Sequence, residues 1–294
     1  MEICIVSGAS GLVGRELADV FVASGRPVRA WQRSPAEARA NVEHARMELG
    51  VTPGADVARA LAGAGVFVHA AWDLDAATWP EIERLNVRGS IAWFEAAARA
   101  GVGKLVFVSS VSAYPGCRSM YGRSKLLVED AVARLGGVTV RPGVVCGDAS
   151  RGVFGRLWNS TDAAWIPLID GGRQNLLTVH RRDLACAIEH IVSDYERWRG
   201  RVVAVGHPQL VTLRDMLERM ARVRGRTPRF VPVPGGLVML GLRSAEAVGL
   251  RLRFRSDSLL TLQGPDPVVE QKLLGELGVS FRSLDDALAS SLPQ

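Results

Sequence analysis

Several features that mark other classes of protein are missing from this chain of 294 residues. Only three of its 36 lysine and arginine residues are lysine, and the arginines never form the dense block expected of a nucleic-acid-binding arm. The four cysteines, at 4, 117, 146 and 186, include no C-x-x-C pair, so neither a zinc site nor a disulfide framework is predicted. We therefore expect no metal, no nucleic-acid partner, and free thiols in a reducing compartment.

Long apolar runs and leader-like segments are also missing. Nowhere do 18 consecutive apolar residues occur, and the most apolar stretch, 235–242, is too short to span a bilayer. The first residues lack the basic region of a signal peptide and have a strand-like pattern instead. With 48% hydrophobic and 22% charged residues and a net charge of +6, the chain can bury a sizeable core. We expect a cytoplasmic protein with no membrane partner.

Short β-rich runs alternate with helical patterns through the first half of the chain. Nearly continuous apolar strands between amphipathic helices predict a parallel sheet covered on both faces, the doubly wound α/β class or Rossmann fold. The expected strands are 3–6, 28–31, 66–70, 104–109 and 138–141, and the expected helices are 12–24, 82–100 and 121–135.

The pattern loosens after residue 142. We expect a dinucleotide-binding domain over 1–146, and mainly a small substrate-binding cap over 147–294. Segments near 176–206, including a strand at 202–205, are expected to return to the first domain. Helices are predicted near 213–223 and 270–277, and the Pro-Val-Pro-Gly-Gly run at 232–236 predicts a hinge-like linker.

A glycine-rich turn, Gly8-Ala-Ser-Gly11-Leu-Val-Gly14, lies between the first strand and the first helix. Glycines there permit a tight turn, a close approach of the backbone to a pyrophosphate, and close packing of helix on strand. The helix N-terminus adds free N–H groups and a positive dipole end. The residues predicted to bind a dinucleotide here are Gly8, Ser10, Gly11, Leu12, Val13 and Gly14.

The end of the second strand selects between NAD and NADP. A site for NAD usually has a carboxylate there that binds the adenosine ribose, but this strand ends in Trp31-Gln32-Arg33. Arg33 could pair with a 2′-phosphate through two parallel hydrogen bonds, or it could be an ordinary surface arginine. We expect Gln32 and Arg33 to contact the cofactor and favour NADP(H), with NAD as the alternative.

The segment Tyr121-Gly-Arg-Ser-Lys125 places a phenol and an ammonium four residues apart on one face of a helix. A nearby cation favours the phenolate and lowers the pKa of the tyrosine, which can then exchange a proton with a carbonyl oxygen during hydride transfer. Upstream, the strand at 104–109 ends in Ser109-Ser110-Val-Ser112, where a hydroxyl could stabilise charge on the substrate oxygen or simply cap the strand. Asn86 could join a water relay to Lys125 or cap a helix.

Together these motifs resemble the extended branch of the short-chain dehydrogenase/reductase family, also described as NAD-dependent epimerases and dehydratases. The resemblance covers nearly the full chain. The segments that match are Gly8-x-x-Gly11-x-x-Gly14, His69-Ala70-Ala71, Asn86-Val-x-Gly89, Ser109-Ser110, Tyr121-x-x-x-Lys125, Arg141-Pro142-Gly-Val144, His180-x-x-Asp183-Leu-Ala185, and 273–288 at the end.

The resemblance implies a role for each matching position. Tyr121 would be the general acid and base, and Lys125 would lower its pKa and hold the nicotinamide ribose. Ser110 would polarise the substrate oxygen, and Asn86 would support the relay. The cofactor would also contact His69, Ala70, Ala71 and Pro142.

Two departures bear on the substrate. Nucleotide-sugar epimerases of the family usually have an arginine four residues before the His-x-x-Asp motif, where this chain has Leu176, and they carry the acid that is missing after the second strand. Arg173 lies nearby and could compensate. We expect a neutral or apolar carbonyl compound, contacted by Trp72, Ser110, Ser112 and Arg173, with Trp79, Trp158 and Trp165 as further candidate walls.

These features predict an NADP(H)-dependent oxidoreductase that transfers hydride between nicotinamide and a carbonyl or alcohol substrate. The alternative enzyme is a nucleotide-sugar epimerase or dehydratase with tightly bound NAD. A cofactor-sensing module is a third reading, although relatives of that kind often lose the tyrosine or the lysine. Helices 82–100 and 121–135 resemble those through which family members often dimerise, but helices that cover a sheet have apolar faces in monomers as well.

Overall fold

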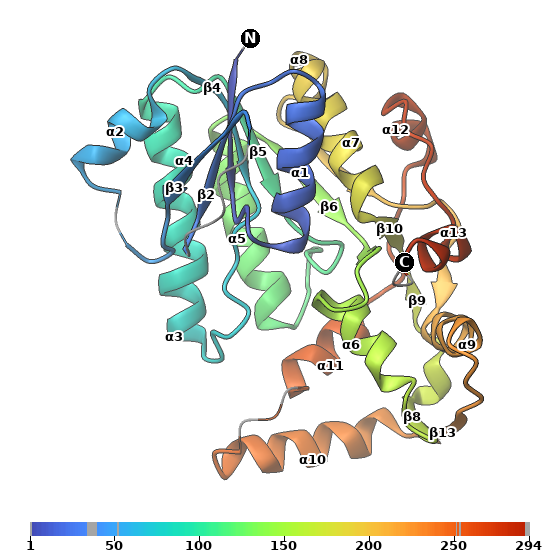
Figure 1. Cartoon of the computed structure of the whole chain (residues 1–294). Helices are drawn as coiled ribbons and strands as arrows, with labels where there is room; N and C mark the ends of the chain where they lie inside the picture. The colour runs from blue at the N-terminus through green and yellow to red at the C-terminus, as the bar shows by residue number, and fades with distance from the viewer. Residues whose placement is uncertain (1, 34–39, 52, 251, 253, 292–294) are drawn as a thin grey trace.

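The computed structural model describes residues 2–33, 40–51, 53–250, 252 and 254–291, and its centre is a seven-stranded parallel sheet (Figure 1). In spatial order the strands are β11 (Val202–Val205), β6 (Val138–Pro142), β5 (Lys104–Val108), β4 (Ala64–His69), β1 (Ile3–Ser7), β2 (Val28–Gln32) and β3 (Val42–Arg46). The chain runs outward from β1 in one direction through β2 and β3, and in the other through β4, β5 and β6. The strand order therefore reverses between β1 and β4, where open α/β sheets bind their ligands.

Helices cover both faces of this sheet. They are α1 (Leu12–Ala23), α2 (Ala55–Leu61), α3 (Trp79–Ile82), the π-helix η1 (Glu83–Arg88), α4 (Gly89–Arg99), α5 (Met120–Arg134), α7 (Arg181–Ser193) and α8 (Tyr195–Trp198). Because successive strand residues point to opposite faces, Val6 and Val68 pack with α1 and α7, whereas Ile5 and Phe67 pack with α4 and α5. The expected doubly wound fold is confirmed.

The remaining elements mostly pack around a second core, in which Phe154, Leu168, Met216 and Leu288 are buried together, although Val179 and Leu274 are buried in the core of the sheet. They are β7 (Val144–Cys146), α6 (Gly152–Ser160), β8 (Trp165–Ile169), the 3₁₀ turn η2 (Asp170–Gly172), β9 (Asn175–Leu176), β10 (Thr178–His180), β12 (Val211–Thr212), α9 (Leu213–Val223), β13 (Arg229–Val233), α10 (Gly235–Ala247), α11 (Ser256–Leu262), α12 (Gln271–Glu276) and α13 (Leu284–Ala289). Among the described residues, no helix is long and apolar enough to cross a membrane.

Several elements differ from the sequence expectations. The expected helix over 82–100 starts earlier and consists of α3, η1 and α4 in succession. Strand β3 and helix α2 were not anticipated. The linker predicted at 232–236 is wrong, because Pro232 and Val233 pair with β8 and α10 begins at Gly235. A proline is tolerated in β13 because this strand belongs to a two-stranded sheet and lies at its edge.

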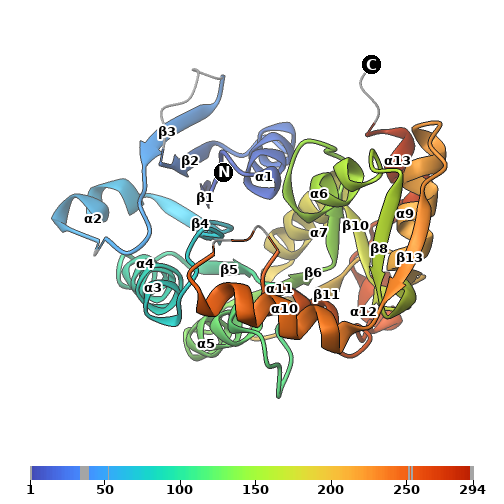
Figure 2. The same cartoon turned by 90° about the horizontal axis from the view of Figure 1, so that it is seen from below.

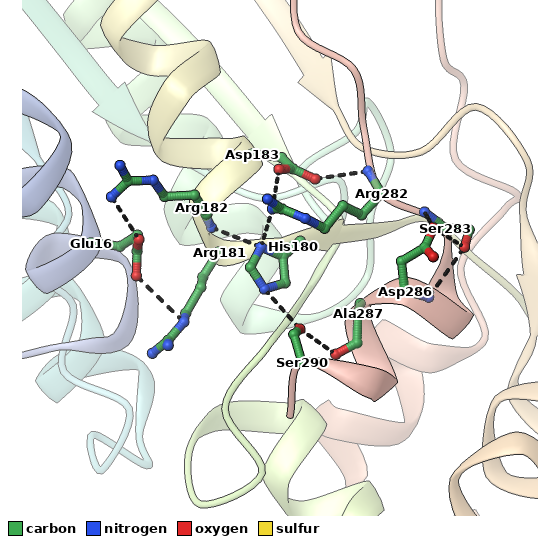
Figure 3. Close-up of polar contacts among 10 residues, drawn as sticks. All are labelled: Glu16, His180, Arg181, Arg182, Asp183, Arg282, Ser283, Asp286, Ala287 and Ser290. Atoms are coloured by element: carbon green, nitrogen blue, oxygen red, sulfur yellow. Dashed lines mark hydrogen bonds and ion pairs between the residues drawn. The ribbon is translucent and has the colours of Figure 1, made fainter. Parts of the chain in front are cut away.

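A polar network fastens the C-terminal residues to the start of α7 (Figure 3). The buried Asp183 carboxylate accepts hydrogen bonds from the backbone N–H and the guanidinium of Arg282, which lie 99 positions away in the chain. The same guanidinium and the backbone N–H of Arg182 donate to Nδ1 of His180, at 2.8 and 3.2 Å. Nδ1 therefore carries no proton, and burial together with Arg282 lowers the pKa of the His180 imidazole.

Asp183→Ala should lower the free energy of unfolding by about 1–3 kcal/mol, because two hydrogen bonds to a buried carboxylate are lost. Urea denaturation measures the change. Asp285→Ala is the control. Asp285 lies in the same C-terminal segment, where it is exposed and forms an ion pair with Arg219 of α9. We expect that control to change stability by less than about 1 kcal/mol. Equal losses in the two variants would show that the buried network adds nothing beyond a surface ion pair.

Candidate active site

The candidate site lies at the carboxyl edge of the sheet, where the strand register brings four residues level. Ser7 of β1 is the partner of Trp31 in β2 and of His69 in β4, and His69 is in turn the partner of Phe107 in β5. The loops that follow these strands carry most of the residues predicted from the sequence. The register therefore gathers segments that lie far apart in the chain at the point where the strand order reverses.

The glycine turn is packed too closely for any side chain. Gly8 has a φ of +68°, and a Cβ there would lie 2.7 Å from the backbone nitrogen of Ala71. A Cβ on Gly14 would lie 2.3 Å from the Gly8 carbonyl oxygen. Gly11 stands at the N-cap of α1 without a side chain to occupy the first-turn N–H groups. The turn is thus a bare backbone cradle, with Ser10, Leu12 and Val13 alongside, and it fits the pyrophosphate of a dinucleotide.

A buried chain of three side chains holds the opposite wall of this cradle. The Ser7 hydroxyl accepts hydrogen bonds from the N–H groups of Ala70 and Ala71 and lies 2.7 Å from Nδ1 of His69. Because both acceptor positions of the hydroxyl are taken, its own hydrogen points to Nδ1, and Nε2 donates to Ser90 at 2.8 Å. Burial lowers the pKa of His69 to about 3, so the ring is neutral and fixes the loop.

Lys125 is almost completely buried beneath this edge. Only 4% of the residue is exposed, and its ammonium donates a hydrogen bond to the Val108 carbonyl at 2.9 Å. The ammonium also lies 3.7 Å from the ring centre of Trp72 and 4.7 Å from that of Phe107. Burial lowers the pKa of Lys125 to about 7, while the carboxylate of Glu129, one turn along α5, acts in the opposite direction. Two aromatic faces and one carbonyl thus replace water around this cation.

Tyr121 stands next to this lysine on the first turn of α5. Its ring meets Trp72 edge-on, with 6.3 Å between the ring centres, and the Ser110 side chain lies beside its hydroxyl. Burial raises the pKa of Tyr121 above its usual value, while the neighbouring Ser110 acts in the opposite direction. Since the Lys125 ammonium is 5.9 Å from the phenol ring and bonded elsewhere, it is not what governs this pKa here. The phenol therefore keeps its proton near neutral pH.

The other catalytic candidates hold the loops around this pair. The Asn86 amide accepts from the backbone N–H of Asp73 and donates to its carbonyl, at 2.7 and 2.8 Å. The Ser112 N–H donates to the Ser110 hydroxyl, and the Pro142 carbonyl accepts from the N–H of Val111. Asn86 belongs to the π-helix η1, a distortion that is frequent at functional sites.

Ser109 has a different partner from Ser110. Its hydroxyl donates to the buried Glu129 carboxylate, which Arg141 holds through two bonds of 3.0 and 2.5 Å. This ion pair joins α5 to β6 directly behind Lys125. It leaves Ser110 as the hydroxyl that faces Tyr121.

Two residues near the site have no signal in the sequence. The Asp257 carboxylate of α11 accepts hydrogen bonds from the N–H groups of Met120 and Tyr121, at 2.5 and 3.2 Å. Arg255 donates to the carbonyls of Ala76 and Ala77, in the loop after β4. Only the fold brings these segments together, since Asp257 lies 136 positions from Tyr121.

The remaining predicted residues lie further from Tyr121. Gln32 is buried at the end of β2, and the side chain of Arg33 is 73% exposed with Nη1 3.9 Å from the Asp73 carboxylate. Arg173 is exposed after η2. Of the candidate tryptophan walls, Trp79 stacks with Arg123 of α5, Trp158 packs on Phe154 in the second core, and Trp165 is exposed on β8. Among the described residues, no group of histidine, cysteine and carboxylate side chains could hold a metal.

Residues 4–206, more than half of the chain, match the NAD dependent epimerase/dehydratase family. The chain belongs to this family. The resemblance drawn from the motifs is thereby confirmed, and the protein is an enzyme of the extended short-chain dehydrogenase/reductase type.

Two curated relatives are a reductase and a dehydrogenase. The ceramide reductase of Caulobacter vibrioides (strain NA1000 / CB15N) is 27% identical over 242 residues, which cover 78% of this chain and 73% of the relative. The 3-beta-hydroxysteroid dehydrogenase of Mycolicibacterium neoaurum is 26% identical over 223 residues, which cover 64% of this chain and 61% of the relative.

Solved structures share the fold over almost the whole chain. The crystal structure of gox2253 has a TM-score of 0.78 at 24% identity and covers 99% of this chain and 97% of the other. MoeE5 in complex with UDP-glucuronic acid and NAD has a TM-score of 0.75 at 20% identity with the same coverage. At this level of identity the likeness establishes the fold.

Deprotonation of Lys125 should be visible in tryptophan fluorescence near pH 7, because the cation lies against Trp72. We expect an inflection at about pH 7 in the wild-type protein that is missing in Lys125→Met. Lys104→Met is the control, since Lys104 forms an ion pair with Glu2 and does not contact Trp72. The sign for stability also follows: the unfolded chain keeps the lysine proton up to a higher pH, so wild-type stability should rise relative to Lys125→Met above pH 7. The same inflection in Lys125→Met would contradict the assignment.

Proposed function

We propose that this enzyme is an NADP(H)-dependent oxidoreductase that interconverts a carbonyl and an alcohol, with Tyr121 as general acid and base. The observation that carries the proposal is the Tyr121 phenol, with Ser110 beside its hydroxyl and the buried Lys125 next to it, at the carboxyl edge of the sheet. A protonated phenol and a hydroxyl that converge on one point can together bind a single substrate oxygen.

A bound nicotinamide supplies or accepts the hydride at the substrate carbon. In the direction of reduction, Tyr121 donates its phenolic proton to the substrate oxygen, on which negative charge develops. Ser110 donates a hydrogen bond to the same oxygen. In the direction of oxidation, Tyr121 takes the proton back. The raised pKa of Tyr121 keeps the proton available for donation near neutral pH.

Lys125 would support this transfer from behind the phenol. The Lys125 ammonium, now bonded to the Val108 carbonyl, would hold the ribose of a bound nicotinamide and would favour the phenolate on Tyr121. Asn86 fixes the Asp73 backbone and would hold the relay water toward Lys125. On the cofactor side, the glycine turn, Ala70, Ala71 and Pro142 would line the dinucleotide, and buried His69 would act on it only through the loop that it positions.

The preference for NADP rests on the exposed Arg33 at the end of β2. Among the described residues, the carboxylate paired with its guanidinium is that of Asp73, and their 3.9 Å separation makes a weak pair that a 2′-phosphate would replace. Gln32 would lie beside the adenosine. NAD is the alternative, since a structural neighbour binds it.

For the substrate, we propose an apolar carbonyl compound. Its support is the aromatic surface of Trp72 beside Tyr121 and the names of the two relatives, whose substrates are a sphingolipid and a steroid. Ser112 would stand at the same wall, and Arg173 would contact the distal part of the substrate. A nucleotide-sugar epimerase with tightly bound NAD is the second candidate, because the neighbour MoeE5 holds a UDP-sugar together with NAD.

Tyr121→Phe should lower kcat by roughly 10²–10⁴-fold in reduction of a hydrophobic ketone, because the acid that protonates the product oxygen is lost. NADPH consumption, followed by absorbance, measures the rate. Tyr195→Phe is the control, since the Tyr195 hydroxyl bonds to the backbone of Leu105 away from the site. Unchanged turnover in Tyr121→Phe would remove the proposed acid. Sugar epimerisation without net cofactor consumption would establish the second candidate instead.

Arg33→Ala should weaken NADPH binding roughly tenfold or more and leave NADH binding unchanged, because a charge-assisted pair with the 2′-phosphate is lost. Titration with each nucleotide, followed by quenching of tryptophan fluorescence, measures both affinities. Arg99→Ala is the matched control, since Arg99 is an exposed arginine at the end of α4. Equal loss for both nucleotides, or tighter wild-type binding of NADH, would overturn the preference for NADP.

A further inference from the structure

Helix α10 presents an apolar face to the surroundings. Leu237 and Leu240 are each 65% exposed, and Val248, at the C-cap of the helix, is 74% exposed. The spacing of three and eight residues between them keeps these side chains on one side of the helix, together with the small residues Gly241 and Ser244. Leu250, directly beyond the helix, is 57% exposed. This face is the opposite of what a helix that only covers a core displays.

The two strands before α10, β8 and β13, carry further exposed apolar side chains. β13 runs parallel to β8, and residues 165, 167 and 169 alternate with Ile166 and Leu168, which point into the second core. Trp165 is 58% exposed, and the guanidinium of Arg229 lies 5.1 Å from its ring centre. Val231 of β13 is also exposed. β8, β13 and α10 together make the lower edge of the molecule in Figure 1.

Two arginines are exposed along this edge, Arg243 on α10 and Arg229 on β13. The exposed Asp170, between β8 and α10, is bonded to the backbone N–H of Gly235 and to Gln263. The single acidic residue of α10, Glu246, is bonded to the N–H and the hydroxyl of Ser256. Exposed leucines on the helix, with Trp165 and two arginines beside them that form no ion pair among the described residues, are the side chains that peripheral contacts with a bilayer interface use. We call the surface formed by Trp165, Val231, Leu237, Leu240, Arg243, Val248 and Leu250 the α10 surface.

We infer that the α10 surface docks on an anionic lipid bilayer, as a peripheral contact and not as a span. The expectation of no membrane partner came from the missing membrane-spanning run, and docking of this kind needs none. A second copy of this chain is the other occupant of such a surface, and the experiments below separate it from a bilayer.

The docked surface would lie next to the proposed site. Figure 2 shows α10 lying across α11 and α5 when the molecule is seen from below. α11 carries Asp257, which bonds to the backbone at Tyr121, so α10 is one helix away from the catalytic tyrosine. An apolar substrate dissolved in the bilayer would therefore lie close to the site. Docking itself does not depend on the proposed reaction.

Sedimentation with vesicles tests the inference without any turnover. The purified full chain is mixed with vesicles of phosphatidylcholine alone, or with 30 mol% phosphatidylglycerol (about one lipid in three, enough for a strongly negative surface). We expect binding to the anionic vesicles that weakens with added salt, and little binding to the neutral ones. Absence of binding to the anionic vesicles would overturn the inference while leaving the proposed reaction intact.

Leu237→Gln and Leu240→Gln should each weaken vesicle binding roughly tenfold, because an exposed leucine no longer enters the interface. Arg243→Gln should weaken it roughly fivefold. Leu127→Gln is the matched control, a leucine exposed on α5, and should bind as the wild type does. Equal loss in Leu127→Gln, or no loss in the two α10 leucine variants, would contradict the α10 surface as the docking site.

Size-exclusion chromatography tests whether a second copy of the chain covers the α10 surface instead. A dimer that Leu237→Gln dissociates would show that it does, and would overturn the inference.

Discussion

The desolvated ammonium of Lys125 is the interaction around which the site is organised. A cation held out of water is stable only where other groups replace the lost hydration, and here the Val108 carbonyl and the faces of Trp72 and Phe107 do so. Each of these partners lies at the end of β4 or β5 or directly after it. The lysine therefore requires both strands to end at the same level, which the His69–Phe107 register provides.

The rest of the site depends on a second set of buried groups that never meet solvent. The neutral His69 ring joins Ser7 to Ser90 and so ties β1, β4 and α4 together at the reversal of strand order. The same serine holds the loop of Ala70 and Ala71, against which Gly8 packs. A rigid cradle of this kind is prepared before a ligand arrives, so binding need not order it.

Local patterns were enough to predict the fold, and they selected residues that the structure gathers at one edge of the sheet. The turn from Gly8 to Gly14 and the four-residue spacing of Tyr121 and Lys125 each depend on one element, which the sequence shows directly. Asp257 could not be predicted, because its partners lie on a helix about 136 positions earlier and only the fold brings them together. The direction of the Tyr121 pKa likewise depends on burial and on where Lys125 points, and neither follows from spacing.

The exposed apolar face of α10 is consistent with the proposed reaction of an apolar substrate. An apolar substrate has a low concentration in water. An enzyme that acts on it therefore benefits when its site lies close to the membrane that holds the substrate. Monomeric proteins rarely keep large apolar patches in contact with water, and a helix that leaves Leu237 and Leu240 exposed loses hydrophobic stabilisation in the free protein. That loss would be recovered if the helix entered a lipid interface. Because α11 lies between α10 and α5, the same contact would bring Tyr121, the proposed acid, to the phase that holds such a substrate.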